Sequence, residues 1–243
     1  SDVYKRQPQN GNIKGKGVAH EGEVSTKLGL KGIPALAEEL QIARDLFILE
    51  YAGGKLHIPT ISTAGSVKLI AEAKKKGLDV SCSVAIHNLF FSDETLVGFD
   101  TNFKVSPPLR TKSDSKALIK GLKNGTIDFV TSDHVPMDVE HKRVEFDNAK
   151  NGSLGLESAF GALNTLFDLD ETVKLLTNGR SRYQIESPKL EEGAKACLTL
   201  FNPEGEYVFE AKDIRSTSKN SMFVGASLKG KVYGIIHNDL TTL

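Results

Sequence analysis

The feature that most constrains the fold is a regular alternation of short apolar segments and helical segments in the first half of the chain. The apolar segments are rich in β-branched residues, and the segments between them carry apolar residues at helical spacing. We expect strands at 56–61, 78–84 and 126–132, and helices at 35–51, 63–76 and 113–124. Strands that alternate with helices at this spacing pair in parallel, so the sequence predicts an α/β fold with a parallel sheet.

The regions on either side of this alternation differ from it in composition. Residues 8–34 are rich in Gly, Lys and Asn and predict a loop. After about residue 196, apolar segments separated by Asn-Pro and Gly signals predict antiparallel strands at 197–201, 207–210 and 231–236. Residues 1–7 resemble translated adapter sequence, and we expect them to be a non-native leader outside the fold. The expected division is therefore a leader at 1–7, an α/β unit at 8–190 and a small β subdomain at 191–243.

The composition excludes several classes of function. The net charge is zero, which gives no reason to expect nucleic acid or an acidic membrane surface as a partner. No apolar run approaches the roughly 18 residues that span a bilayer. The two cysteines, Cys82 and Cys197, match no metal or redox spacing and are expected to be structural thiols. This cysteine usage favours a reduced, cytoplasmic compartment.

The strongest candidate for chemistry is Asp133, which with His134 follows the predicted strand at 126–132. A carboxylate at the end of a parallel strand can hold a metal, accept a proton, or do both. It can equally be the N-cap of a helix. Polar residues also follow the other two strands, at Thr60 and His87. Because the carboxyl ends of parallel strands meet at one edge of a sheet, this convergence favours the functional interpretation of Asp133.

A series of short motifs in a fixed order resembles the later part of the dihydroorotases, which belong to the amidohydrolase superfamily. No single motif is specific, but their order along the chain is. The similarity runs from about residue 16 to the C-terminus. It rests on Gly17-Val18-Ala19-His20-Glu21-Gly22, Gly32-Ile33-Pro34 with Glu38, Ile42-Ala43-Arg44-Asp45, His57-x-x-x-Ile61-Ser62-Thr63, Phe103-Lys104-x-x-Pro107-Pro108-Leu109-Arg110, Gly125-Thr126-Ile127-Asp128, Ser132-Asp133-His134-x-Pro136, Gly155-x-Glu157 and Lys219-Asn220-x-x-Phe223-x-Gly225.

The resemblance implies a fold and a reaction. The fold is a TIM-type (β/α)8 barrel of which residues 8–190 would supply about the last three β/α units, followed by a small antiparallel β subdomain. The reaction is the reversible hydrolysis of dihydroorotate to carbamoyl-aspartate in pyrimidine biosynthesis, with zinc as cofactor. Asp133 matches the aspartate that shuttles the proton and contacts the metal.

Several positions depart from the family pattern. Thr60 stands where the family has a histidine ligand, and a hydroxyl is a poor zinc ligand because it stays protonated. The family's first ligands, an H-x-H pair, and its bridging ligand match no segment of this chain. His57 and His134 are expected to support the site without touching the substrate. The residues that match the family's substrate-binding positions are Ser106, Met137, Asn151 and Gly152.

Three hypotheses follow for the function. The first is a fragment of a dihydroorotase-like cyclic amidohydrolase, acting on a small cyclic amide and inactive as this chain, because the ligands are missing or substituted. The second is a non-catalytic dihydroorotase-like subunit that assembles with aspartate transcarbamoylase. A homodimer is the other expected assembly. The third is a related hydantoinase- or allantoinase-type enzyme.

Overall fold

The centre of the molecule is a four-stranded parallel sheet. The computed structural model describes residues 3–5, 8–238 and 240–242. The strands are β1 (Val3–Lys5), β4 (Lys55–Ile58), β5 (Val80–Ala85) and β6 (Phe129–Thr131), in the order β1-β4-β5-β6. All neighbours pair in parallel, with Leu56 opposite Val80 and Val84 opposite Val130. The predicted parallel α/β fold is confirmed.

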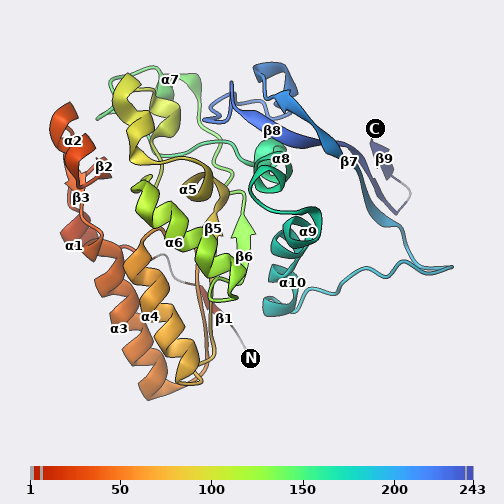
Figure 1. The fold of residues 1–243 in the computed structure, drawn as a ribbon, viewed down its shortest axis with the longest axis horizontal. Coiled ribbons are helices and arrows are strands. Elements are labelled where there is room, and N and C mark those ends of the chain that lie inside the picture. The colour runs from red at the N-terminus through yellow and green to blue at the C-terminus, as the bar shows by residue number, and fades with distance from the viewer. Residues whose placement is uncertain (1–2, 6–7, 239, 243) are drawn as a thin grey trace.

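Three long helices lie side by side along one face of this sheet (Figure 1). They are α3 (Leu36–Ala52), α4 (Ala64–Lys75) and α6 (Lys112–Lys123). The N-cap of α4 is Thr63, whose hydroxyl accepts a hydrogen bond from the Ser66 N–H. Helix α6 begins at Lys112, one residue before its expected start, and its N-cap is Thr111, which forms a reciprocal capping box with Asp114.

The parallel strands present apolar side chains on one face of the sheet and polar side chains on the other. Leu56, Ile58, Cys82 and Val84 join the main hydrophobic core. On the other face, the ring of His57 lies between the Ser81 and Ser83 hydroxyls, at 2.8 and 3.2 Å. Alternation of apolar and polar residues in a wholly buried strand such as β5 therefore reflects two different buried environments.

Residues 8–34 are more ordered than the predicted loop. They form α1 (Gly11–Lys14), β2 (Ala19–His20), α2 (Glu23–Leu28) and β3 (Gly32–Ile33), and β2 pairs with β3 in parallel. Fully buried Arg110 attaches this segment to the rest of the molecule. Its guanidinium donates to the Ile33 carbonyl at 2.9 Å, to His20 Nδ1 at 3.0 Å and to Ser62 Oγ at 3.1 Å. These contacts between distant residues leave no local sequence pattern, which explains why the prediction was wrong here.

The remaining elements follow β5 and β6. They are α5 (Ile86–Phe90), the 3-10 helices η1 (Asp93–Gly98), η2 (Thr101–Phe103) and η3 (Ala211–Asp213), and the helices α7 (Val139–Lys142), α8 (Leu156–Leu166), α9 (Leu169–Thr177) and α10 (Gly179–Arg182). Most residues of the charged segment 138–145 are exposed. Lys142 is buried and donates to the carbonyls of Thr101 and Lys150 at 2.8 and 2.9 Å.

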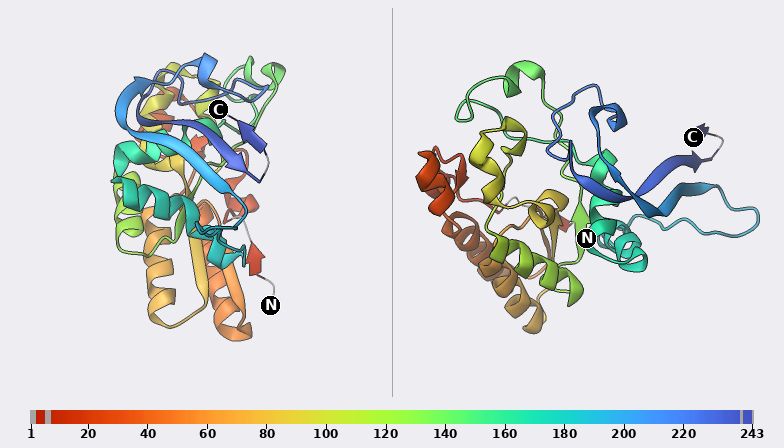
Figure 2. Two further views of the ribbon diagram at one scale, coloured as in Figure 1. Left: turned by 90° about the vertical axis from the view of Figure 1, so that its right-hand side faces the viewer. Right: turned by 45° about the horizontal axis from the view of Figure 1, so that its top comes forward.

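The C-terminal region forms an antiparallel sheet of β7 (Cys197–Val208), β8 (Ser227–His237) and β9 (Leu240–Thr242) (Figure 2). The segments predicted as two strands at 197–201 and 207–210 are one continuous strand with irregular register, so Asn202-Pro203 is an irregularity and not a turn. Phe209, Phe223 and Leu228 belong to the same hydrophobic cluster as the parallel sheet. The division at residue 191 stays a prediction.

Part of the N-terminal segment pairs with the parallel sheet, while its assignment as a non-native leader stays a prediction. Val3–Lys5 forms β1, whose residues pair with Lys55–His57 of β4. Residues 1–2 and 6–7 lie outside the described residues. Across the part of the chain that is described, no helix combines the length and the apolar character that a membrane crossing requires.

Candidate active site at the carboxyl ends of the strands

The structure brings the polar residues that follow β4, β5 and β6 to one edge of the parallel sheet. Thr60 lies two residues after β4, His87 follows β5, and Asp133 lies two residues after β6. Thr60 and Asp133 have φ angles of 50° and 44°. The left-handed region is uncommon for aspartate and a true outlier for a β-branched threonine. Such strained backbone gathers at functional sites.

His87 lies beside Asp133, a contact that the sequence did not predict. Its ring is 2% exposed, and Nε2 lies 3.8 Å from Asp133 Oδ2. That separation is too long for a hydrogen bond. Burial lowers the pKa of His87 to about 4, so the ring is neutral at pH 7 and the contact is not an ion pair. Its Nε2 has no hydrogen-bond partner among the described atoms. The signal in the sequence was its position two residues after β5, equivalent to that of Asp133 after β6.

His134 turns to the start of α8. Its Nδ1 accepts hydrogen bonds from the backbone N–H groups of Gly155 and Leu156, at 3.3 and 3.2 Å. The Glu157 carboxylate lies 3.7 Å from the same nitrogen. His134 thus ties the segment after Asp133 to the N-terminus of α8, where unpaired N–H groups need an acceptor.

His57 lies deeper in the molecule. It is 1% exposed, and besides Ser81 and Ser83 it stacks on Phe129, with ring centroids 5.0 Å apart. Tyr183 meets the same ring edge-on at 5.5 Å. These contacts are those of a packing and hydrogen-bonding residue.

The four expected substrate-binding residues lie in loops joined by polar contacts. Ser106 Oγ accepts from Lys14 Nζ at 3.2 Å. The Met137 N–H donates to Asn220 Oδ1 at 3.0 Å, and Asn220 Nδ2 donates to the Gly152 carbonyl at 3.2 Å. Asn151, next to Gly152, is exposed. Buried Asn220 therefore connects the Met137 and Gly152 loops, a role that its place in a resemblance motif did not reveal.

Gly155 sits where the strand end and α8 come closest. A Cβ at this position would lie 2.0 Å from the Ser132 carbonyl oxygen. We expect Gly155→Ala to displace the backbone next to Asp133 and to lower the free energy of unfolding by about 3 kcal/mol or more, as severe overpacking does. Chemical denaturation measures this. Gly98→Ala is the matched control, because no atom lies within 4 Å of its added Cβ; equal losses in the two variants would contradict the prediction.

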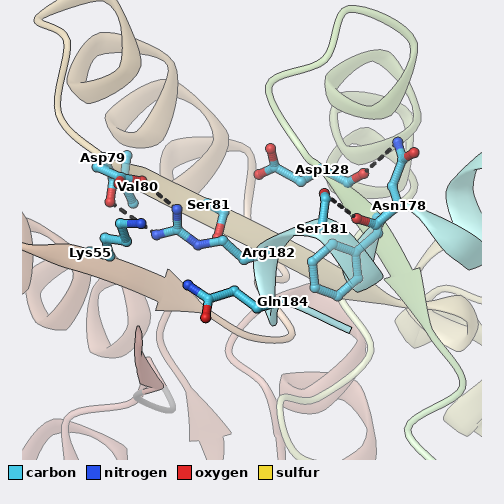
Figure 3. A pocket seen from close by; sticks show the side chains of 10 residues that line it. Lys55, Asp79, Val80, Ser81, Asp128, Asn178, Ser181, Arg182 and Gln184 are labelled. Atoms are coloured by element: carbon cyan, nitrogen blue, oxygen red, sulfur yellow. Dashed lines mark hydrogen bonds and ion pairs between the residues drawn. The ribbon is translucent and has the colours of Figure 1, made fainter. Parts of the chain in front are cut away.

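A separate cavity of about 550 Å³ lies at the opposite ends of the strands (Figure 3). Lys55, Asp79 and Asp128 line it at the starts of β4, β5 and β6, and Arg182 closes it from α10. Arg182 donates to the carbonyls of Leu56 and Asp79 at 2.8 and 3.1 Å and pairs with the Asp79 carboxylate. The Arg182 guanidinium therefore holds α10 against the sheet. We take the Asp133 edge, and not this cavity, as the candidate site.

The residues at the Asp133 edge do not make a complete zinc site. Catalytic zinc needs three protein ligands, drawn from imidazole, thiolate and carboxylate groups. Within the described ranges, no group of three or more His, Cys, Asp or Glu side chains is arranged to hold a metal ion. Asp133 and His87 are two such donors, and Thr60 offers only a hydroxyl.

Comparisons with known proteins agree with these observations. A family model described as "Dihydro-orotase-like" matches residues 2–66. The chain is 42% identical over 227 residues to a dihydroorotase of Syntrophus aciditrophicus, covering 91% of this chain and 53% of that protein. It is 43% identical over 232 residues to one of Pelotomaculum thermopropionicum, covering 93% and 54%. The chain thus spans about half the length of the curated relatives it matches.

Solved structures show the same fold. The L-hydantoinase (dihydropyrimidinase) of Arthrobacter aurescens superimposes with a TM-score of 0.85 at 23% identity, over 99% of this chain and 56% of that chain. The dihydropyrimidinase of Brevibacillus agri gives a TM-score of 0.82 at 22% identity, over 99% and 56%. The sequence relatives are dihydroorotases and the motifs lie in their order, so the resemblance of this chain to the dihydroorotases is confirmed over about half of their length.

Proposed function

We propose that this chain is part of a cyclic amidohydrolase that interconverts dihydroorotate and carbamoyl-aspartate in the cytoplasm. It would supply about the last three β/α units of a (β/α)8 barrel and the small β subdomain. The observation that carries the proposal is Asp133, held at the carboxyl end of β6 beside His87 in a chain over 40% identical to dihydroorotases. The names of these relatives favour an enzyme over a non-catalytic partner of aspartate transcarbamoylase.

The chemistry required of Asp133 is proton transfer. Hydrolysis of an amide needs a group that takes a proton from the attacking water and returns it to the leaving nitrogen. The Asp133 side chain is 25% exposed, so it can reach both a water and a substrate. Neutral His87 places no charge beside this carboxylate. Zinc would activate the water in a complete site, but the ligands for it would have to come mainly from outside this chain.

The first test uses the chain alone. We expect substoichiometric zinc and no turnover of carbamoyl-aspartate, because two donors and a hydroxyl do not satisfy the metal. Metal analysis of the purified protein after zinc addition and dialysis, together with a cyclisation assay, measures both. Stoichiometric zinc or steady turnover would contradict the expectation.

The second test supplies the missing half. A chimera joins this chain to the other half of the Syntrophus aciditrophicus dihydroorotase. We expect Thr60→His to raise its zinc affinity by about 10-fold or more, and Asp133→Asn to lower its rate by about 100- to 10,000-fold. Asp138→Asn, at an 81% exposed position, is the control. Full activity of the Asp133→Asn chimera would refute the proton-transfer role, and a preference for hydantoin over dihydroorotate would refute the substrate.

A further inference from the structure

The chain between Asp133 and helix α8 forms a long loop whose two ends are held together. This loop, here called the 135–152 loop, contains the short helix α7 (Figure 1). The Asn220 side-chain amide donates to the carbonyls of Val135 and Gly152, at 3.1 and 3.2 Å. The Val135 N–H also donates to the Ser153 carbonyl at 2.9 Å. The loop therefore leaves the Asp133 edge and returns to it, and its shape depends on what holds its middle.

Lys142 holds the middle of the 135–152 loop from inside. This residue is 7% exposed. Its Nζ donates to the carbonyls of Thr101, Lys150 and Lys104, at 2.8, 2.9 and 3.4 Å. In return, the Thr101 hydroxyl donates to the Lys142 carbonyl at 2.6 Å. An ammonium group has three protons to donate. All three are used here, and they join the loop to a segment that begins 41 residues earlier in the chain.

Lys104 makes the complementary contact from that earlier segment. It is 5% exposed, and its Nζ donates to the carbonyls of Phe146 and Asp147, at 2.7 and 2.9 Å. The same ammonium group lies 5.5 Å from the centre of the Phe146 ring, within the range of a cation–π contact. Each segment thus inserts one lysine into the other. These contacts are separate from those that Asn220 makes at the ends of the loop.

The Lys104 carbonyl connects this arrangement to the proposed substrate-binding positions. It accepts from the Gly152 N–H at 2.9 Å as well as from Lys142 Nζ. Lys104 also lies two residues before Ser106, and both Gly152 and Ser106 are expected to bind the substrate. The Lys142 ammonium group therefore contacts the same carbonyl that places Gly152 beside the segment of Ser106.

The two ammonium groups are buried at a cost. Burial, together with the positive charge of Lys104, lowers the pKa of Lys142 to about 8, and Asp100 opposes this shift. Burial also lowers the pKa of Lys104, where Asp147 opposes the shift and Lys14 adds to it. Buried charges are weak evidence for stability, because apolar residues of similar volume often stabilise a protein as well or better. An apolar residue at position 142 could not donate to carbonyls of two separate segments, so geometry explains the lysine better than stability does.

We propose that Lys142 is a positioning residue for the reaction proposed above. It holds the 135–152 loop on the segment around Thr101 and Lys104, so that Gly152 and Ser106 keep the spacing that the substrate requires. Lys142 does not contact the substrate itself, because its three protons are used within the protein. The role rests on the proposed function, whereas the closure of the loop can be tested apart from any reaction.

Trace acetylation of the 243-residue chain with acetic anhydride tests the closure of the loop. Mass spectrometry measures the reaction rate at each lysine. We expect Lys142 and Lys104 to react at least about 10-fold more slowly than exposed Lys150 of the same loop, because a buried amine reacts only when the loop opens. Equal rates at the three lysines would show that the loop is open in solution. That result would overturn the proposal whatever the activity of the protein, and it does not depend on the folding of a variant.

Hydrogen exchange of matched variants tests the contact of Lys142 with the loop. Lys142→Met keeps the length of the side chain and removes its three donors. We expect it to raise the exchange rate of the Gly152 N–H by about 10-fold or more, because buried carbonyls lose their donor. Lys150→Met is the control, since the Lys150 side chain is exposed and only its carbonyl takes part. An unchanged rate at Gly152 in Lys142→Met would overturn the proposal.

Kinetics of the chimera described above separate positioning from folding. We expect Lys142→Met to raise KM for carbamoyl-aspartate by about 10-fold or more and to leave kcat within about 3-fold, because the loop carries substrate contacts while Asp133 stays in place. A fall in kcat with KM unchanged would overturn the positioning role. An inactive wild-type chimera would overturn the proposed function and with it the role of Lys142 in the reaction, whereas acetylation and exchange would still decide whether Lys142 holds the loop.

Discussion

Glu38→Ala is expected to lower the free energy of unfolding by about 3–5 kcal/mol. The Glu38 side chain is fully buried. Its Oε1 accepts from the N–H groups of Ser62 and Thr63, at 2.7 and 3.2 Å, and from Ser66 Oγ at 2.6 Å. Its Oε2 accepts from the Ser62 hydroxyl.

Removal of this carboxylate would leave two kinds of buried group without their partner. The donors at the start of α4 would lose their acceptor, and an unsatisfied buried donor costs about 1–3 kcal/mol. The Arg110 guanidinium, 3.9 Å from Oε2, would lose the nearest buried negative charge. Since native proteins have a total stability of about 5–15 kcal/mol, this loss would remove a large share of the free energy of unfolding.

Urea denaturation of matched variants tests this expectation. Glu50→Ala on the same helix is the control, because its ion pair with Lys76 is exposed and worth less than about 1 kcal/mol. Glu38→Gln keeps the shape and one acceptor, so it should fall between the two. A loss for Glu38→Ala no larger than that for Glu50→Ala would show that the network does not hold α3 to α4.

The second large effect is acid destabilisation through His87. Burial lowers its pKa from 6.5 to about 4. Between these pH values the unfolded chain binds the proton and the folded protein does not, so stability falls as the pH falls. The contribution of the neutral ring is complete above pH 6.5 and is lost as the pH approaches 4. One pKa unit corresponds to 1.36 kcal/mol, so the loss amounts to about 3 kcal/mol.

The comparison with His87→Gln isolates this contribution, because glutamine does not titrate. The difference in unfolding free energy between wild type and variant should be constant above pH 6.5 and should shift by about 3 kcal/mol against the wild type toward pH 4. His141→Gln is the control, since His141 is 40% exposed. A difference that stayed constant over the whole range would mean that the His87 ring is protonated freely in the folded state.

The sequence predicted those parts of the fold that depend on neighbouring residues. The strands β4, β5 and β6 and the helices α3, α4 and α6 lie within a few residues of their expected positions. The signals for these elements involve residues that are close in sequence. They are the spacing of apolar residues, the N-cap Thr63 of α4 and the C-cap Gly53 of α3. The position of Asp133 at a strand end followed from the same pattern.

The sequence did not predict which side of α3 is buried. The apolar residues that indicated the helix include Leu36, Leu40 and Phe47, and these are exposed. The buried side is held by Glu38, whose partners lie 24 to 28 residues further along the chain. Buried Lys142 is a second example, because its partner Thr101 lies 41 residues before it.

Some features of the candidate site were likewise predictable from the sequence, and others were visible only in the structure. The sequence by itself determined that an aspartate, a histidine and a threonine follow three parallel strands, because strand ends are marked by local pattern. Only the tertiary structure brought His87 within 3.8 Å of Asp133 and linked the Met137 and Gly152 loops through Asn220, 83 residues beyond Met137. The physical reason is that burial and the hydrogen bonds of buried groups depend on residues brought together by folding, and no local period in the chain encodes those distances.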